Sequence, residues 1–474
     1  MTKYTELNFD SLARALPGRV SRAGDARYEE AVAIWNGSIT RRPAAVAHCG
    51  DAQDVSRAII FARENRVEIS VRGGGHNFAG NALCAGGLTI DLSTQRKVSV
   101  DPTRLRARCG GGTRWAELDA ACQEHGLAVT GGMISHTGVA GLALGGGLGW
   151  LHNKVGLTCD NLLAVEIVTA DGSILRASES ENTELFWAVR GGGGNFGVVT
   201  EFEFKLTQLG PLVNLGMFFY GLDQGAAMLR FSNEFTREMS DETGVFICGL
   251  NAPPAPFVPA AQQGQPCYAL LVAGLGDAHA HARQVEAIRA AIPPLFELVT
   301  PIPYTELQKM FDASAPWGIH AYEKAVYLRE LNEPAIAVIT RQFPNKPTPQ
   351  SFLPILVLGG QYARVPEDSV AFGGRRDTRY VVNITAMTDE PARLEPGIAW
   401  ARNFWSELVP HAESVGSYVN YLVEPDEARV RASYGAAKYA RLGSIKAKYD
   451  PDNLFHLNAN IRPGEFTRGP LLSQ

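Results

Sequence analysis

Three dense glycine clusters are the part of this sequence whose residue types and spacing most clearly point to chemistry. They are Gly73-Gly74-Gly75, the segment 138–149 and the run from Gly191 to Gly194. Glycine is used where the backbone must take a positive φ or where a ligand must approach the main chain. Backbone N–H groups in such loops can bind a pyrophosphate. We therefore interpret the clusters as a cofactor-binding site; the alternative is that they are only tight turns.

Two familiar nucleotide fingerprints do not fit these clusters. None of them matches the GxGxxG pattern that opens a helix after a first strand near the N-terminus, and GxxxxGK[ST] does not occur. The seven cysteines are scattered without a CxxC pair, and His279 and His281 lack a third ligand nearby. We expect reduced, mostly buried thiols and no metal site.

Composition limits the class of protein. The 474 residues are 45% hydrophobic with a net charge of −5 and no basic block, which argues against nucleic-acid binding and against a polybasic membrane surface. We find neither a long apolar stretch nor a signal peptide, so we expect a cytoplasmic protein with no membrane partner. The length predicts two or three domains.

The elements that must position the glycine loops are a mixture of helices and strands. The apolar spacing predicts a helix over 51–65 with Asp51 as its cap, and a strand over 67–71 that leads into Gly73. Asp171-Gly172 between two apolar runs predicts a hairpin. From about residue 207 the chain becomes richer in proline and in β-type runs, which predicts a second domain built around an antiparallel sheet.

Five long motifs resemble one flavoprotein family. They are the segments 71–77 (VRGGGHN), 135–150 (SHTGVAGLALGGGLGW), 156–161 (GLTCDN), 190–200 (RGGGGNFGVVT) and, near the end, 448–460 (KYDPDNLFHLNAN). Together and in this order they resemble the berberine-bridge-enzyme-like FAD-linked oxidases of the vanillyl-alcohol oxidase / p-cresol methylhydroxylase (PCMH) superfamily.

The resemblance implies an α+β fold in which a two-subdomain FAD-binding domain of the PCMH type carries an inserted antiparallel-sheet substrate domain. We expect the FAD-binding domain over residues 1–206, the substrate domain over 207–414, and a C-terminal segment, 415–474, that returns to the FAD domain.

The resemblance also implies which residues bind the cofactor. His76 matches the histidine that is covalently bonded to the 8-methyl group of the flavin. A second link through cysteine is not expected, because no cysteine lies between Cys122 and Cys159. The expected FAD-binding residues are Arg72, Gly73, Gly74, Gly75, His76, Asn77, Ser135, Thr137, Gly138, Gly141, Gly145, Val199, Asn458 and Asn460.

On the substrate side, Tyr421 matches a family tyrosine that faces the substrate, and it is the expected catalytic base if a neighbour lowers its pKa. The alternative is that it only shapes the pocket. Tyr380, Asn383 and Tyr322 are further pocket candidates. Val139 matches a residue beside the flavin, where valine is more typical of oxidases than of dehydrogenases.

The implied activity is that of an FAD-dependent oxidase. It removes a hydride from an alcohol or amine carbon of a small molecule, with a sugar or a secondary metabolite among the candidates, and O2 becomes H2O2. The alternatives are a dehydrogenase with another acceptor, an oxygenating biosynthetic flavoenzyme, and a flavin-binding module without turnover. The sequence names neither the substrate nor the oligomeric state.

Overall fold

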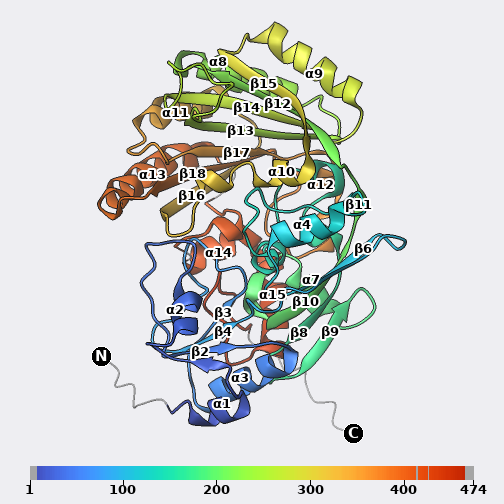
Figure 1. Ribbon diagram of the computed structural model, residues 1–474, viewed down its shortest axis with the longest axis vertical. Coiled ribbons are helices and arrows are strands. Elements are labelled where there is room, and N and C mark those ends of the chain that lie inside the picture. The colour runs from blue at the N-terminus through green and yellow to red at the C-terminus, as the bar shows by residue number, and fades with distance from the viewer. Residues whose placement is uncertain (1–7, 413–414, 425, 465–474) are drawn as a thin grey trace.

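The computed structural model describes residues 8–412, 415–424 and 426–464, and it confirms the predicted α+β architecture (Figure 1). Two small sheets belong to the N-terminal part of the chain, and one large antiparallel sheet belongs to the middle part. Within the described residues, no helix is both long and apolar enough to cross a membrane.

The first sheet positions the loop Gly73-Gly74-Gly75. Its strand order is β1-β2-β4-β3, with β2, β4 and β3 parallel. The predicted helix forms as α3, and Asp51 caps it by accepting the N–H of Asp54 at 2.9 Å. The glycine loop follows β3 directly. The bounds are β1 (Val20–Ser21), β2 (Ala45–His48), β3 (Ile69–Arg72), β4 (Leu88–Asp91), α1 (Asp10–Ala15), α2 (Ala26–Val32) and α3 (Ala52–Glu64).

The second sheet is antiparallel, with the order β5-β6-β10-β8-β9. The predicted hairpin joins β8 to β9, and Gly172 takes φ +85° in its turn. The bounds are β5 (Val98–Asp101), β6 (Arg106–Gly110), β8 (Leu162–Val168), β9 (Ile174–Ser178), β10 (Val198–Lys205), α4 (Trp115–Gln123), α5 (Val139–Leu144), α6 (His152–Val155) and α7 (Thr183–Val189). A two-stranded pair, β7 (Leu127–Ala128) with β11 (Thr207–Gln208), precedes the middle part.

The large sheet has the order β15-β12-β14-β13-β17-β18-β16, and Figure 1 shows α8 and α9 on its outer side. Alternate residues of its strands contact either these outer helices or the N-terminal part of the chain. The strands are β12 (Leu212–Tyr220), β13 (Thr243–Asn251), β14 (Pro266–Gly274), β15 (Phe296–Pro303), β16 (His320–Leu328), β17 (Leu353–Val357) and β18 (Tyr380–Thr388). The helices are α8 (Gly225–Phe235), α9 (Ala278–Ala291), α10 (Tyr304–Lys309), α11 (Glu333–Gln342), α12 (Gly360–Arg364) and α13 (Leu394–Leu408).

The C-terminal helices α14 (Glu427–Tyr434) and α15 (Ala436–Tyr449) pack back onto the N-terminal part. Leu442 and Ile445 of α15 share a core with Phe196, which follows the third glycine cluster. Lys446 is fully buried, and its ammonium group donates to the carbonyls of Asn195 and Phe455, each at 2.8 Å, and to Asp450 at 2.7 Å. All three donors of the lysine are therefore used.

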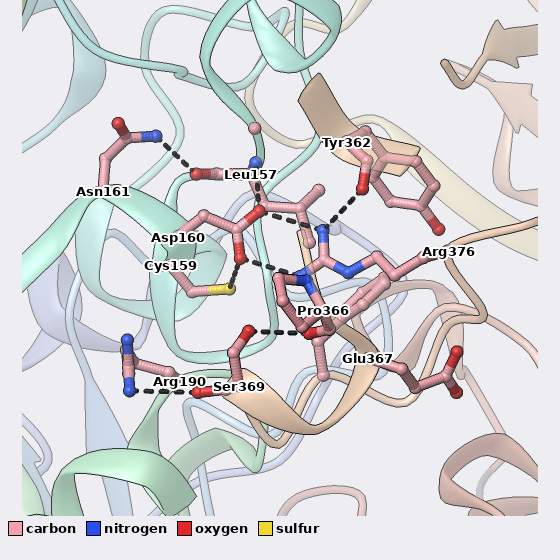
Figure 2. A network of polar contacts seen from close by, with 12 residues as sticks. Leu157, Cys159, Asp160, Asn161, Arg190, Tyr362, Pro366, Glu367, Ser369 and Arg376 are labelled. Atoms are coloured by element: carbon pink, nitrogen blue, oxygen red, sulfur yellow. Dashed lines mark hydrogen bonds and ion pairs between the residues drawn. The ribbon is translucent and has the colours of Figure 1, made fainter. Parts of the chain in front are cut away.

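A second buried ion pair joins the N-terminal part to the middle part (Figure 2). Arg376 binds the carboxylate of Asp160 through both terminal nitrogens, at 2.9 and 2.7 Å, and both side chains are 5% exposed. The same guanidinium donates to the carbonyl of Tyr362, while Asp160 also accepts the N–H of Leu157. The segment 156–161, singled out in the sequence, thus has a structural role at this contact.

Candidate active site

A cavity of about 400 Å³ lies between the glycine loops and the inner face of the large sheet. Its lower wall comes from the loops around residues 73–78, 132–148 and 193–199 and from the C-terminal stretch 455–459. Its upper wall comes from the inner residues of β13, β17, β18 and β16, and the segment 418–422 closes one side. The three glycine clusters therefore meet at one site.

Bare backbone forms much of the lower wall. A Cβ on Gly74 would lie 2.3 Å from the backbone of Gly138, so the first two glycine loops pack closer than any side chain permits. A Cβ on Gly141 or Gly194 would meet nothing within 4 Å, and both residues line the cavity. A ligand can therefore approach the main chain at these points, as the sequence pattern predicts.

His76 lies in an aromatic enclosure in the wall of this cavity. Its ring stacks on Trp35 with centroids 4.4 Å apart, and its Nε2 is 3.1 Å from Nδ1 of His136. Burial, together with the nearby charge of His136, lowers the pKa of His76 to about 3. The imidazole is therefore neutral and keeps a lone pair. Trp35 and His136 were not predicted as neighbours of His76. His136 belongs to the motif 135–150, but the sequence does not show that its ring meets that of His76.

Most of the predicted FAD-binding residues lie together in the wall of the cavity. Those that line it are Gly73, Gly74, Gly75, His76, Asn77, Thr137, Gly138, Gly141, Val199 and Asn458.

Arg72 and Ser135 do not line the cavity, because carboxylates hold them elsewhere. Arg72 is buried and its Nη1 donates to Asp91 at 2.9 Å, which ties β3 to β4. The Ser135 hydroxyl donates to Asp312 at 2.5 Å. Both residues support the loops that carry the cavity wall.

Gly145, Asn460 and Val139 also lie outside the cavity wall. Gly145 caps the C-terminal end of α5 and packs against the Asn420 side chain. A Cβ on Gly145 would lie 2.1 Å from Oδ1 of Asn420. Val139 is fully buried in the hydrophobic core below the loop, so the expectation that it lies beside the flavin is not met.

Tyr380 and Tyr322 were wrong as pocket residues, because each lies on the outer face of the large sheet. The Tyr380 hydroxyl bonds to Thr236 and Asn233, near α8. The Tyr322 hydroxyl donates to Glu424 at 2.9 Å. Side chains alternate between the two faces of a strand, which explains the error. On β18, Tyr380 and every second residue after it face outward, whereas Asn383 faces the cavity.

Glu323 is the functional candidate that our sequence analysis missed. It is fully buried on β16, lines the cavity, and accepts the N–H of Asn383 on Oε2 at 2.8 Å. Burial raises the pKa of Glu323 to about 8, although the Asn383 hydrogen bond opposes this. The available signal was weak, because Glu323 stands between Tyr322 and Lys324 in a strand that also begins with His320.

Tyr421 lines the cavity as expected, but in a 3₁₀ turn, Val419–Tyr421, instead of a strand. Its ring packs edge-on against Tyr418, whose hydroxyl accepts the N–H of Gly147 at 2.8 Å. Burial and the nearby Glu323 and Tyr418 raise the pKa of Tyr421 well above its ordinary value. Among the described residues, none is found to lower that pKa, and the role of Tyr421 as the base stays a prediction.

The remaining 3₁₀ turns within the described residues are Cys159–Asn161, Gly193–Asn195, Leu222–Gln224, Asp312–Ser314, Phe343–Asn345, Glu367–Ser369, Pro391–Arg393 and Val409–His411.

Comparison with protein families matches residues 43–178 to an FAD binding domain and residues 417–462 to the berberine and berberine-like family. Over 459 residues the chain is 30% identical to (R)-6-hydroxynicotine oxidase of Paenarthrobacter nicotinovorans, covering 95% of this chain and 97% of that protein.

Solved structures agree in fold. The crystal structure of 6-hydroxy-D-nicotine oxidase from Arthrobacter nicotinovorans superposes with a TM-score of 0.84 and 28% identity, covering 94% of this chain and 98% of that one. Glucooligosaccharide oxidase from Acremonium strictum, described with a 6-S-cysteinyl, 8α-N1-histidyl FAD, gives a TM-score of 0.84 at 21% identity, over 96% of this chain and 99% of that one. The latter likeness concerns the fold alone.

Proposed function

We propose that this chain, which belongs to the berberine-like family of FAD-linked oxidoreductases, is an oxidase that removes a hydride from a small molecule and passes the electrons to O2. The observation that carries the proposal is the single cavity in which the glycine loops, His76 and the buried Glu323 meet. One end offers backbone to a cofactor, and the other end offers a largely apolar chamber in which Glu323 is the carboxyl group among the described residues.

The residues present fit FAD. The open backbone at Gly141 and Gly194 leaves room for a pyrophosphate, and the Asn458 amide, whose oxygen is buried without a hydrogen-bond partner, lines the same wall. When bound there, FAD supplies the hydride acceptor and the reaction with oxygen. The protein's own part is to orient the substrate, exclude water and accept a proton.

His76 is the residue that we propose as the covalent attachment point of FAD, at the flavin 8-methyl carbon. Its neutral ring has the lone pair that such a bond needs, and Trp35 and His136 hold the ring in place. We propose that this is the single covalent bond to FAD. A second bond would need a cysteine shortly before Thr137, and the residues that line the cavity there are Met133 and Ile134.

The mass of the intact denatured protein tests this link. The wild-type chain should carry one added FAD mass, and His76→Ala should show the bare chain mass with FAD released on denaturation. His136→Ala is the informative companion, because it keeps His76 but removes its ring partner, and it should lower the covalent fraction. A bare mass for the wild-type protein, with free FAD in solution, would refute covalency.

Oxygen consumption tests the oxidase proposal. Holoenzyme mixed with alcohols, amines and sugars should release H2O2 with at least one class, and the oxidised flavin absorbance should fall when the mixture is anaerobic. A flavin that no compound reduces, although dithionite does, would favour a binding module without turnover.

A further inference from the structure

The cavity has one carboxyl group and, among the described residues that line it, no lysine or arginine. That carboxyl belongs to Glu323, which is 0% exposed and forms no ion pair within the described part of the chain. A carboxyl buried away from water and from cations is costly to ionise, so proteins seldom keep one without a partner. Nothing in the fold requires it, because β16 pairs with β18 through its backbone.

The hydrogen bonds around Glu323 leave acceptors open. Asn383 donates its amide N–H to Oε2, while Oε1 of Glu323 and Oδ1 of Asn383 have no partner. The hydroxyl of Thr385, directly opposite Glu323 in the strand register, is also unpartnered. With Glu323 ionised, Oε1 of Glu323 and Oδ1 of Asn383 are both open acceptors, while the Thr385 hydroxyl can donate or accept. A ligand group with two N–H or O–H bonds would satisfy both open acceptors.

The other side chains that line the cavity indicate the character of the rest of the ligand. Beside Glu323 and Asn383, the described residues that line the cavity include Met133, Leu148, Phe246, Phe311, Phe352 and Leu356. A sugar bound there would lose the hydration of most of its hydroxyls without replacement hydrogen bonds. The ligand is therefore apolar apart from one polar group, and a protonated amine is the group that supplies both the two donors and the missing positive charge.

We propose that Glu323 and Asn383 bind the amino group of a small, otherwise apolar primary or secondary amine, and that Glu323 takes up the proton from its nitrogen. This inference rests on the proposed function, since the flavin is the electron acceptor. The carboxylate removes one proton from the ammonium group. With FAD bound, the cofactor would accept the adjacent C–H electron pair as hydride, and the nitrogen lone pair would form the C=N bond of an iminium product.

Among the described residues, the titratable side chains near Glu323 on the inner face of the sheet are tyrosines. Tyr421 faces it from the turn 419–421, and Tyr327 lies further along β16; burial raises the pKa of both well above the ordinary value. On the β17 side the wall is apolar, with Pro354 and Leu356. Glu323 is thus the group in this chamber that changes charge in the neutral to mildly alkaline range.

A binding experiment with probes that cannot react isolates this claim from turnover. The probes are 2-phenylpropan-2-amine and 2-phenylpropan-2-ol, which have the same shape and no hydrogen on the carbon beside the polar group. Wild-type holoenzyme should bind the amine more tightly than the alcohol. Glu323→Gln should weaken amine binding by roughly 10–100-fold, the loss of a charge-assisted hydrogen bond, and change alcohol binding little. Asn383→Ala should weaken amine binding less.

Flavin reduction by benzylamine and N-methylbenzylamine completes the test. Glu323→Gln should slow reduction by about 10²–10⁴-fold, as for loss of a general base, with unchanged flavin content and unchanged reoxidation by O2. Glu333→Gln, on the exposed side of α11, is the matched control and should behave as wild type.

Two outcomes separate this inference from the proposed function. If alcohols or sugars reduce the flavin while the amines neither bind nor reduce it, or if Glu323→Gln changes amine binding and reduction less than about threefold, the amine site is refuted and the oxidase remains. If no compound reduces a flavin that is present and dithionite-reducible, the oxidase itself is refuted; equal binding of both inert probes would then refute the amine site too.

Discussion

At the scale of single residues, the buried carboxyl of Glu323 has a consequence for stability that needs no substrate. Its pKa in the folded protein, about 8, is above the ordinary value of 4.5. Folding therefore favours the protonated form, so stability is lost as the pH rises from about 4 to about 8 and stays low above that. Glu323→Gln should match wild type near pH 4 and be the more stable protein at pH 9. Thermal unfolding of both at a series of pH values measures this, with Glu124→Gln, at an exposed position, as control. A constant difference across pH would contradict it.

At the scale of elements, the C-terminal helix α15 depends on Lys446 for its attachment to the third glycine cluster. The ammonium group is buried and bonded to Asn195, Asp450 and Phe455. Lys446→Met should cost about 3–5 kcal/mol of unfolding free energy, because it leaves Asp450 as a buried, uncompensated charge. Lys448→Met, two residues further along on the exposed face of α15, should cost less than about 0.5 kcal/mol. Denaturant unfolding measures both; equal effects would show that the buried network is not what anchors α15.

At the scale of the whole molecule, the Asp160–Arg376 ion pair binds the segment before β18 to the N-terminal part of the chain (Figure 2). Arg376→Leu should destabilise the protein by about 3–5 kcal/mol, since Asp160 would remain buried without its partner. The exposed pair between Arg364 and Asp241 offers the contrast, and Arg364→Leu should cost at most about 1 kcal/mol. Chemical denaturation monitored by flavin fluorescence and by far-UV circular dichroism distinguishes separation of the two parts from global unfolding. Coincident, wild-type-like curves for Arg376→Leu would contradict the role given to this pair.

Much of the fold and of the cofactor side of the site could be predicted from the sequence. The glycine clusters can be recognised from the sequence alone, because a close backbone approach such as that of Gly74 to Gly138 admits no other residue. The helix capped by Asp51 and the hairpin at Asp171-Gly172 are also local signals. These features need no knowledge of distant contacts.

The substrate side could not be predicted as well, because it depends on strand parity. Tyr322 and Glu323 are adjacent, yet only Glu323 faces the cavity, and β16 is buried on both faces, so hydrophobic alternation does not mark the inner one. Arg72 and Ser135 were misplaced for a related reason: their partners, Asp91 and Asp312, are set by tertiary structure.

The most direct test of the account is the anaerobic reaction of purified holoenzyme with N-methylbenzylamine, followed by the absorbance of the oxidised flavin. We predict bleaching by the amine at a rate that rises with pH as Glu323 ionises, and little bleaching by benzyl alcohol or cellobiose. Glu323→Gln should lose the amine reaction with the flavin still bound. Bleaching by the alcohol or the sugar at rates that Glu323→Gln leaves unchanged, with none by the amine, would contradict it.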